Sequence, residues 1–407
     1  MANPPTSYDY IVIGAGSAGS IVAAGLAASK KAPSVLLLEA GKDAKDVKEL
    51  WDPNYINSLY DIKDIHWGYK SVPQSHMNNR VLDVWRAKIT GGCTAHNDMV
   101  YSRGARADYD EWESVHGCTG WAYNDVASIF DKVEAKLNPT TTTENTFGTD
   151  FVDACVGLGY AWNPNYNSGQ SMFGVSALQS TINEEFTRVT SYESYVPGGA
   201  LKNLSVQIQA LVDRIEFDEK KQTSGVRYYV NGTLTKANVT SEVILCAGSI
   251  NSPQILMRSG IGNSTVLKNA GVTNTIVDNS EVGQNMWGAL IMLGSWTTSQ
   301  PIYNQPVNEG YAIVWANIND KDQPNNCLEM MRGLYIANQT EAQLEGHYSV
   351  TGGAMRLQSK GSVVITTSDY TMPPVIDMKF LSADGDFEQC LDAFDLMREI
   401  GNSPGLA

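Results

Sequence analysis

The sequence predicts an α/β fold that opens with a parallel, doubly wound sheet. An apolar strand, Tyr8–Ile13, is followed by an Ala-rich helical segment, Ser17–Ala28, and by a second apolar strand, Val35–Glu39. Ala32-Pro33-Ser34 separates the helix from the second strand. A β-α-β opening of this kind is the usual beginning of a parallel sheet whose helices cover both faces.

Later segments predict a continuation of this sheet and a second sheet. Residues 51–80 show little periodicity and are expected to form a surface loop. A helix is predicted at Tyr123–Leu137, and the run 138–145, rich in Thr and Asn, is a plausible domain boundary. Strands are expected at Val206–Ala210, Ile215–Phe217, Val226–Val230 and Glu242–Ala247, with second-sheet strands at Val363–Thr366 and Val375–Asp377.

Length and charge exclude some classes of partner. A chain of 407 residues allows two or more domains, or one interleaved unit, and 43% hydrophobic residues can bury a large core. The 29 Lys and Arg against 44 Asp and Glu give a net charge of −15. This balance argues against a nucleic-acid groove and against an anionic membrane surface.

Targeting and metal signals are weak. Tyr10–Ser29 carries no charge, but its four glycines fit a turn and helix better than a membrane span. No basic, apolar and small-residue leader is recognisable, so a cytoplasmic protein is the default expectation, and a secreted one if a leader was removed. The six cysteines show no Cys-x-x-Cys pair, so no metal site is expected.

A glycine-rich turn follows the first strand. Gly14-Ala15-Gly16-Ser17-Ala18-Gly19 fits G-x-G-x-x-G, whose glycines permit a tight turn, the approach of a pyrophosphate, and close helix–strand packing. Glu39 ends the next strand, where a carboxylate can accept hydrogen bonds from a ribose diol. The alternative is a Gly-rich turn in an unrelated α/β protein.

A second glycine-rich turn, Thr90-Gly91-Gly92-Cys93-Thr94-Ala95-His96-Asn97, follows a long irregular excursion. A nicotinamide enzyme would usually continue its sheet sooner. A polar Gly-Gly loop beside the first turn favours a large planar ligand such as an isoalloxazine ring.

These motifs together resemble the glucose–methanol–choline (GMC) flavin oxidoreductases, over nearly the whole chain. The resemblance rests on both glycine turns and on Leu38-Glu39-Ala40-Gly41, Trp85-Arg86-Ala87-Lys88, Tyr101-Ser102-Arg103-Gly104, Asp108–Trp112 and Ala247–Gly262. It implies a Rossmann-like FAD-binding domain, interleaved with a substrate domain that is built on an antiparallel sheet. It also implies oxidation of the CH–OH group of a small-molecule alcohol, with hydride passing to flavin N5.

The resemblance carries site roles onto this sequence. Gly14, Gly16 and Gly19 would hold the pyrophosphate and Glu39 the adenosine ribose. The Gly91–Asn97 loop would pass the flavin, with Asn97 near the ring. The other implied FAD contacts are Ser17, Ala18, Ala40, Arg86, Gly91, Gly92, Met99, Val100, Val212 (through its backbone, on the adenine side), Ala247 and Gly248.

His96 stands out within the second turn. The loop is similar to that of choline oxidases, in which the matching histidine is joined covalently to the flavin. A neutral imidazole nitrogen is a competent nucleophile for such a bond. The alternative is a loop histidine that hydrogen-bonds the cofactor or the backbone. His66, His76, His116 and His347 lack a motif and are expected to be surface or structural residues.

The implied domains are 1–160 and 199–287 for FAD, and 161–198 and 288–407 for the substrate. Family members use a histidine near the C-terminus as base, and none of the five histidines here maps onto it. We therefore expect a chain truncated before that segment, lacking one strand of the FAD sheet, and unstable unless a partner chain supplies it. A second departure is Val282–Ala289, which lacks the family's usual Asp-His. Two further hypotheses are a non-redox, hydroxynitrile-lyase-like enzyme and an inactive FAD-binding fragment.

Overall fold

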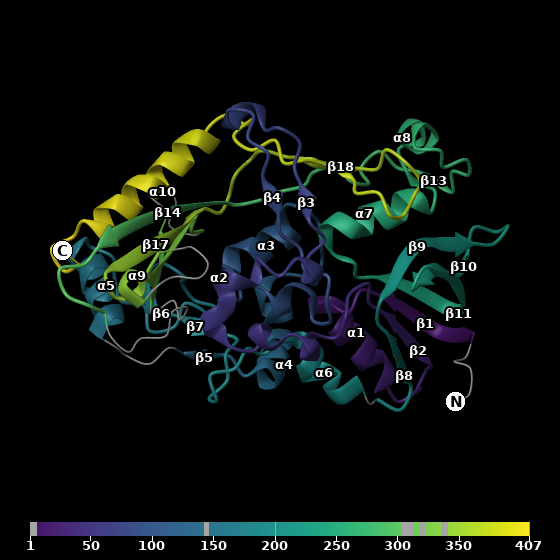
Figure 1. Ribbon diagram of the computed structural model, residues 1–407, viewed down its shortest axis with the longest axis horizontal. Helices are drawn as coiled ribbons and strands as arrows, with labels where there is room; N and C mark the ends of the chain where they lie inside the picture. Colours follow the sequence, from purple (N-terminus) through teal and green to yellow (C-terminus); the bar gives the residue numbers. More distant parts are fainter. Residues whose placement is uncertain are drawn as a thin grey trace.

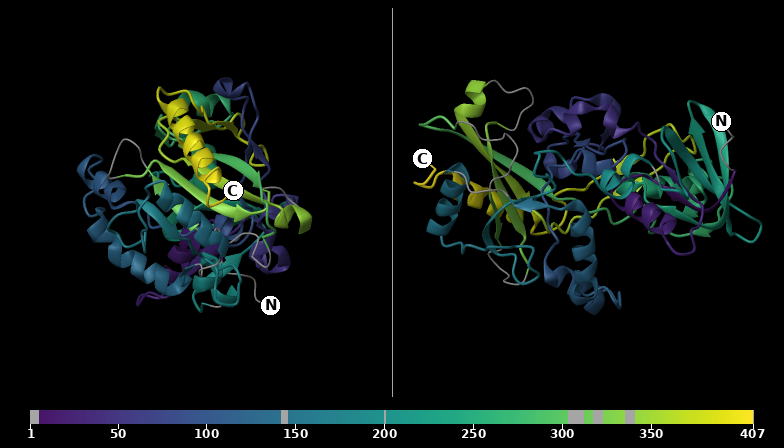
Figure 2. Two further views of the ribbon diagram at one scale, coloured as in Figure 1. Left: turned by 90° about the vertical axis from the view of Figure 1, so that its left-hand side faces the viewer. Right: turned by 90° about the horizontal axis from the view of Figure 1, so that it is seen from below.

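The computed structural model describes residues 6–141, 146–199, 201–302, 312–316, 323–334 and 341–406. The molecule is elongated, with one large sheet near each end and irregular segments and helices between them (Figures 1 and 2). The predicted opening is confirmed: β1 (Ser7–Ile13), α1 (Ser17–Ala27) and β2 (Val35–Leu38) follow one another in the chain, and β1 pairs with β2 in parallel.

The first sheet has six strands in the order β8-β2-β1-β11-β10-β9. Strands β8 (Leu204–Gln207), β2 and β1 run parallel, while β9 (Ala210–Phe217), β10 (Thr223–Val230) and β11 (Thr233–Leu245) form an antiparallel meander. The first part of β11 pairs with β10 and its last part pairs with β1 in parallel. This single strand therefore joins the meander to the parallel sheet.

Both faces of β1 and β2 are covered, which explains why these strands are apolar throughout. Val12 and Leu37 pack toward α1 and α6 (Ser191–Tyr195), whereas Ile13 and Leu38 belong to a cluster with side chains of β9, β10 and α7 (Gly248–Arg258). The α/β fold class predicted from the sequence is confirmed.

Two strand predictions in this region were wrong in their limits. The predicted strand Val206–Ala210 spans a break, because β8 ends at Gln207, Gln209 has φ +52°, and β9 begins at Ala210. Glu242–Ala247 is only the end of the 13-residue β11. The predicted helix Tyr123–Leu137 is α4. Of the predicted linker, residues 142–145 lie outside the described residues.

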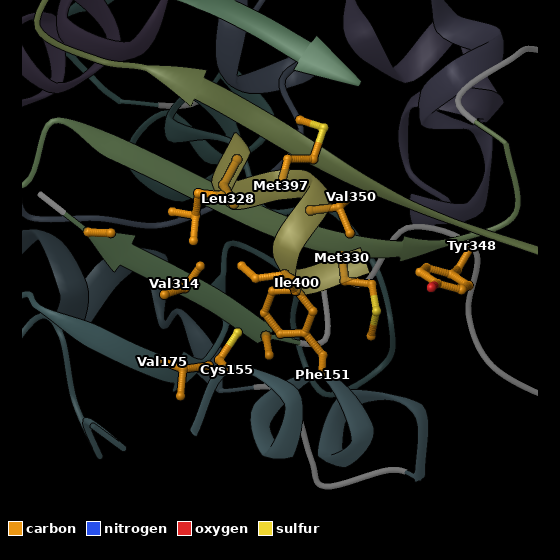
Figure 3. Close-up of a cluster of buried hydrophobic side chains, with 13 residues drawn as sticks. Phe151, Cys155, Val175, Val314, Leu328, Met330, Tyr348, Val350, Met397 and Ile400 are labelled. Carbon is orange, nitrogen blue, oxygen red and sulfur yellow. The ribbon is translucent and has the colours of Figure 1, made fainter. Parts of the chain in front are cut away.

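The second sheet is antiparallel and has five strands in the order β14-β17-β16-β15-β6. Its strands are β6 (Gly174–Ala177), β14 (Leu290–Thr297), β15 (Ala312–Ala316), β16 (Asn326–Arg332) and β17 (His347–Ala354). Helices α5 (Thr146–Gly157) and α10 (Asp386–Gly401) cover one face, where Phe151, Leu328 and Ile400 share a buried cluster (Figure 3). The strands predicted near 363 and 375 are β18 (Ser362–Val364) and β19 (Val375–Asp377), which form a separate two-stranded sheet.

The predicted loop 51–80 is mostly irregular. The remaining helices and strands of the molecule are short. These elements are α2 (Ile56–Leu59), α3 (Arg106–Ser114), α8 (Ser264–Asn269), α9 (Glu341–Glu345), β3 (Tyr69–Lys70), β4 (Asp83–Val84), β5 (Thr140–Thr141), β7 (Gln179–Ser180), β12 (Ile261–Gly262) and β13 (Val277–Asp278). Within the described ranges, none of the helices combines the length and apolarity that a membrane crossing requires.

One edge of the first sheet is open. Residues 239–245 of β11 pair with β1 on one side, and no strand of the described chain pairs with their other side. An open edge of this kind can accept a further strand. The expected instability without a partner chain stays a prediction.

Candidate functional site

The first glycine turn lies where β1 ends and α1 begins, next to the end of β11. Gly14 has φ +101°, and a Cβ there would lie 2.4 Å from the carbonyl oxygen of Cys246. A Cβ on Gly19 would lie 1.9 Å from the carbonyl oxygen of Gly14. Both positions therefore require glycine for turn, strand and helix to pack as they do.

The N-terminus of α1 is left open by this packing. Gly16 is the N-cap residue and offers no side chain to the first free N–H groups of the helix. Ser17 and Ala18 in the first turn are exposed, and that turn contains no acidic residue. Free N–H groups and the positive end of the helix dipole together favour a bound anion such as a phosphate group.

Glu39 connects this turn to the end of β2. Its Oε2 accepts a hydrogen bond from the Ala15 N–H at 2.9 Å, and its Oε1 accepts one from the Gly41 N–H at 2.8 Å. Burial raises the pKa of the carboxyl from 4.5 to about 7, against the opposing effect of these backbone bonds. Each oxygen keeps further acceptor capacity, so the group can also accept bonds from a ligand.

The second glycine turn comes up against the first. Gly91 and Gly92 have φ +87° and +53°, and the turn continues as a 3-10 helix, Gly92–Ala95. A Cβ on Gly92 would lie 2.7 Å from the Cα of Gly16. The two loops that the sequence singled out are thus in backbone contact, at the carboxyl ends of the parallel strands.

Arg188 holds the second turn in place. It is 2% exposed, and its Nη1 donates to the carbonyl oxygens of Thr94 (3.3 Å) and Asn97 (2.8 Å) and to Oδ1 of Asn97 (2.9 Å). Its Nε donates to the carbonyl oxygen of Leu50 at 2.8 Å. Burial lowers the pKa of this guanidinium to about 10, so it stays charged at neutral pH. No recognisable motif surrounds Arg188 in the sequence, so its role could not be predicted.

His96 is buried at the end of this turn with nothing bound to its ring. It is 5% exposed, and neither Nδ1 nor Nε2 has a hydrogen-bond partner among the described residues. Burial, followed by the nearby His66, lowers its pKa to about 3. The imidazole is therefore neutral at physiological pH, with one nitrogen lone pair available.

His66 lies beside His96 and is more than the isolated histidine that the sequence suggested. The two rings meet edge to face with centroids 5.4 Å apart, and the rings of Tyr60 and Trp85 lie against His66 at 6.2 and 5.1 Å. His66 Nε2 lies 2.8 Å from the carbonyl oxygen of Leu59 and must donate to it. Its Nδ1 is buried and has no hydrogen-bond partner among the described residues.

The other predicted residues occupy different surroundings. Met99 is fully buried and packs with Ile182, and Arg86 donates from Nη1 to the carbonyl oxygen of Trp85 at 2.8 Å. Val100 packs against the second sheet. The residues gathered around the two turns at the ends of β1, β2 and β11 are Gly14, Gly16, Ser17, Ala18, Gly19, Glu39, Ala40, Gly91, Gly92, Ala247 and Gly248.

Val212 lies apart from the turns, on β9, and is buried. Its carbonyl oxygen already accepts a hydrogen bond from Nη2 of Arg258 at 3.4 Å. The neighbouring Ala210 donates its N–H to the carbonyl oxygen of Glu39 at 2.8 Å. Val212 therefore lies on β9 two residues beyond Ala210, which contacts Glu39 at the end of β2.

Comparison with known proteins identifies the family. The sequence model described as GMC oxidoreductase matches residues 8–288. The chain belongs to the GMC oxidoreductases. At the level of this family it is an FAD-dependent alcohol oxidoreductase.

Individual relatives support this assignment. This GMC oxidoreductase is 31% identical to an oxygen-dependent choline dehydrogenase from Pectobacterium atrosepticum, over 98% of this chain and 78% of the relative. The enzyme of the same name from Proteus mirabilis is 30% identical, over 98% of this chain and 79% of its own. These alignments take in 98% of this chain and 78–79% of each relative, and the expectation of a truncated chain stays a prediction.

Solved structures share the fold. Pyridoxine 4-oxidase from Mesorbium loti superposes with a TM-score of 0.87 at 24% identity, covering 98% of this chain and 81% of its own. A variant of formate oxidase from Aspergillus oryzae also gives 0.87, at 21% identity, covering 100% of this chain and 83% of its own.

Replacing Gly19 by alanine should damage the first turn, because the new Cβ meets the Gly14 carbonyl. We expect Gly19→Ala to lower the free energy of unfolding by about 2–3 kcal/mol in urea titrations. The matched control is Gly25→Ala in the same helix, where a Cβ has no atom within 4 Å. That change should raise stability by about 0.5–1 kcal/mol. Equal effects of the two substitutions would contradict the packing described here.

The buried Glu39 should make the stability of the FAD-free protein depend on pH. Its folded pKa of about 7 lies above the ordinary 4.5, so the folded state binds more protons between these values and loses stability as pH rises. Between pH 5 and 8, wild type should lose about 2–3 kcal/mol more unfolding free energy than Glu39→Gln. Parallel pH profiles for the two proteins would show that Glu39 is not the cause.

Proposed function

We propose that this chain binds FAD across the two glycine turns and oxidises the CH–OH group of a small cationic or neutral alcohol. The observation that carries the proposal is the backbone contact of Gly16 with Gly92 beside the open N-terminus of α1. A dinucleotide needs both a phosphate site and room for the flavin along one continuous surface. The two turns supply these next to each other.

The residues present fit the cofactor. The uncapped N–H groups after Gly16 suit the pyrophosphate, and the remaining acceptor capacity of Glu39 suits a ribose diol. A Cβ on Gly248, at the start of α7, would meet no atom within 4 Å, so the space beside this glycine is open. The other FAD contacts proposed are the residues that the family resemblance implies, including Val212 on the adenine side.

The domain boundaries are part of the same proposal. Residues 1–160 and 199–287 would form most of the FAD-binding part, and 161–198 and 288–407 most of the substrate part. Two helices depart from these boundaries, because α5 packs on the second sheet and α6 packs on the first. The division of the substrate part is supported by the order of the second sheet, in which β6 from residues 161–198 lies beside β15 from residues 288–407.

Bound FAD supplies the acceptor for a hydride from the alcohol carbon. The chain's own part is to fix the loop and keep its environment dry. Arg188 fixes Thr94 and Asn97, and the neighbouring ring of His96 packs edge to face against His66. We assign no residue as the proton acceptor. Choline is the first alcohol to test, since the two similar dehydrogenases described above carry that name.

Anaerobic mixing with an alcohol tests the proposed reaction. The purified protein with FAD bound should lose its flavin absorbance when choline or another short alcohol is added without oxygen. A hydroxynitrile-lyase-like enzyme would convert its substrate while the flavin stays oxidised. A protein that binds FAD but neither bleaches nor turns over any alcohol would be the inactive fragment, and the proposal would fail.

We further propose that His96 is the point of covalent attachment of FAD. The support is its burial, its neutral state and the lack of a hydrogen-bond partner for either ring nitrogen among the described residues, with the ring of His66 packed against it. Attachment exchanges one N–H bond of His96 and one C–H bond of the cofactor for an N–C bond. Two electrons and two protons then pass to a two-electron acceptor such as dioxygen.

Acid denaturation tests the attachment. Wild-type protein should keep its flavin in the acid pellet, and a peptide containing His96 should carry the mass of FAD. His96→Ala should release all its flavin, while the control His116→Ala, at an exposed position, should behave as wild type. Complete release of flavin from the wild-type protein would rule out the bond and leave the alcohol oxidation untouched.

A further inference from the structure

Two tyrosine rings from distant parts of the chain lie face to face on the first sheet. Tyr229 is on β10, and Tyr370 is on the connection between β18 and β19. Their ring centroids are 4.0 Å apart, and their planes differ by 7°. Aromatic pairs in proteins usually have centroids about 4.5–7 Å apart. The two phenol rings therefore form an unusually close parallel stack.

The ring of Tyr229 is held by the sheet. Its residue is paired with Leu211 of β9 on one side and with Leu234 of β11 on the other. Tyr228, the preceding residue, belongs to a buried cluster of the first sheet. Because strand side chains alternate between faces, Tyr229 points away from that cluster. Its ring is half-buried, so it lies at the edge of the solvent.

The ring of Tyr370 is held by a turn. Asp369 accepts hydrogen bonds at Oδ1 from the N–H and from the hydroxyl of Thr371, each at 2.8 Å. The N–H of Met372 donates to the carbonyl oxygen of Asp369 at 3.3 Å. Tyr370 lies between these residues and is half-buried as well. Both rings are thus set by their backbones and open to a small reagent.

Negative charge lies beside the stacked rings. The hydrogen bonds from Thr371 lower the pKa of Asp369, which is therefore a carboxylate at neutral pH. Burial raises the pKa of Tyr370, and the nearby Tyr229, Asp369 and Asp213 add to this effect. Negative charge that opposes the loss of a proton alone favours the loss of an electron from the same ring. Tyr370 is therefore a good donor to a one-electron oxidant.

Parallel tyrosines at this distance are arranged for oxidative coupling. Removing one electron and the hydroxyl proton from a tyrosine leaves a phenoxyl radical, whose unpaired spin lies partly on the ring carbons next to the C–O carbon. When both rings are oxidised, two such carbons join. Two C–H bonds are replaced by one C–C bond and both hydroxyl groups are restored, so that the oxidant gains two electrons and water two protons.

We propose that Tyr229 and Tyr370 are a modification site, at which a one-electron oxidant joins the two rings as dityrosine. The oxidant belongs to the diffusible class that haem peroxidases form from hydrogen peroxide. The bond does not depend on the proposed alcohol oxidation. It ties the connection between β18 and β19 to the meander of the first sheet. Cross-linking residues so far apart in the chain restricts the unfolded state and stabilises the fold.

Another tyrosine pair in the molecule provides an internal control. Tyr109 and Tyr123 also lie in contact, with ring centroids 5.9 Å apart. Their planes differ by 64°, so the edge of one ring meets the face of the other. This arrangement does not bring two ring carbons together without rotating a side chain. Nearness alone would favour coupling at both pairs, whereas the parallel stack favours it only at Tyr229 and Tyr370.

The test exposes purified full-length protein to a light-generated ruthenium(III) tris-bipyridyl complex, with persulfate as the final electron acceptor. Wild type should gain dityrosine fluorescence while staying monomeric on a denaturing gel. Its digest should contain a linked pair of peptides, lighter by two hydrogen atoms, that joins Tyr229 to Tyr370. Tyr229→Phe and Tyr370→Phe should each abolish this product, and Tyr109→Phe should leave it unchanged. The linked protein should unfold at a temperature higher by roughly 5 °C.

Several results would overturn the proposal. One is fluorescence that persists in Tyr229→Phe, and another is a linked peptide pair that lacks either residue. A product found only between molecules would do the same, as expected if an exposed tyrosine such as Tyr55, which is 48% exposed, reacts instead. Should a phenylalanine variant not fold, the peptide map of wild type decides: a link between the two residues supports the site, and its absence refutes it.

Discussion

The approach of two backbones, at Gly16 and Gly92, is the constraint on which the candidate site depends. A Cβ on Gly92 would lie 2.7 Å from the Cα of Gly16, so Gly92 cannot carry a side chain without displacing the first turn. The contact sets the second turn against the end of β1. Glu39 then ties the first turn to the end of β2 through the Ala15 and Gly41 N–H groups. Without these contacts, the ends of the parallel strands would present separate loops rather than one binding surface.

The second turn is fixed from beneath by a buried charge. An arginine that is almost fully buried is stable here because its hydrogen bonds go to carbonyl oxygens and to one amide oxygen. Such a group allows the loop little freedom, since moving Asn97 would leave part of a guanidinium unsatisfied in a dry interior. The neighbouring His96 is thereby kept in a defined place, although its ring nitrogens have no hydrogen-bond partner among the described residues.

The sequence predicted the elements whose structure depends on residues close together in the chain. Strand β1, helix α4 and both glycine turns follow from apolar runs, helix periodicity and glycine spacing, and the family followed from the motifs around them. Arg188 and His66 could not be found in this way. Their surroundings are assembled from segments far apart in the chain, such as Leu50 and Asn97, which both accept hydrogen bonds from Arg188. The break between β8 and β9 at Gln209 could not be predicted, because a single residue with positive φ does not change the alternation of apolar and polar residues.

The double pairing of β11 also affects how the protein is made. During synthesis, β1 emerges first and has only β2 and, later, β8 to extend the sheet; its central neighbour, residues 238–245, leaves the ribosome far later. Until then the long-range ladder is absent and the apolar edge of β1 stays available to other chains. Contacts of such high sequence separation form slowly. Chaperone demand during translation should therefore be greatest before the meander is complete, and should fall once β11 has docked.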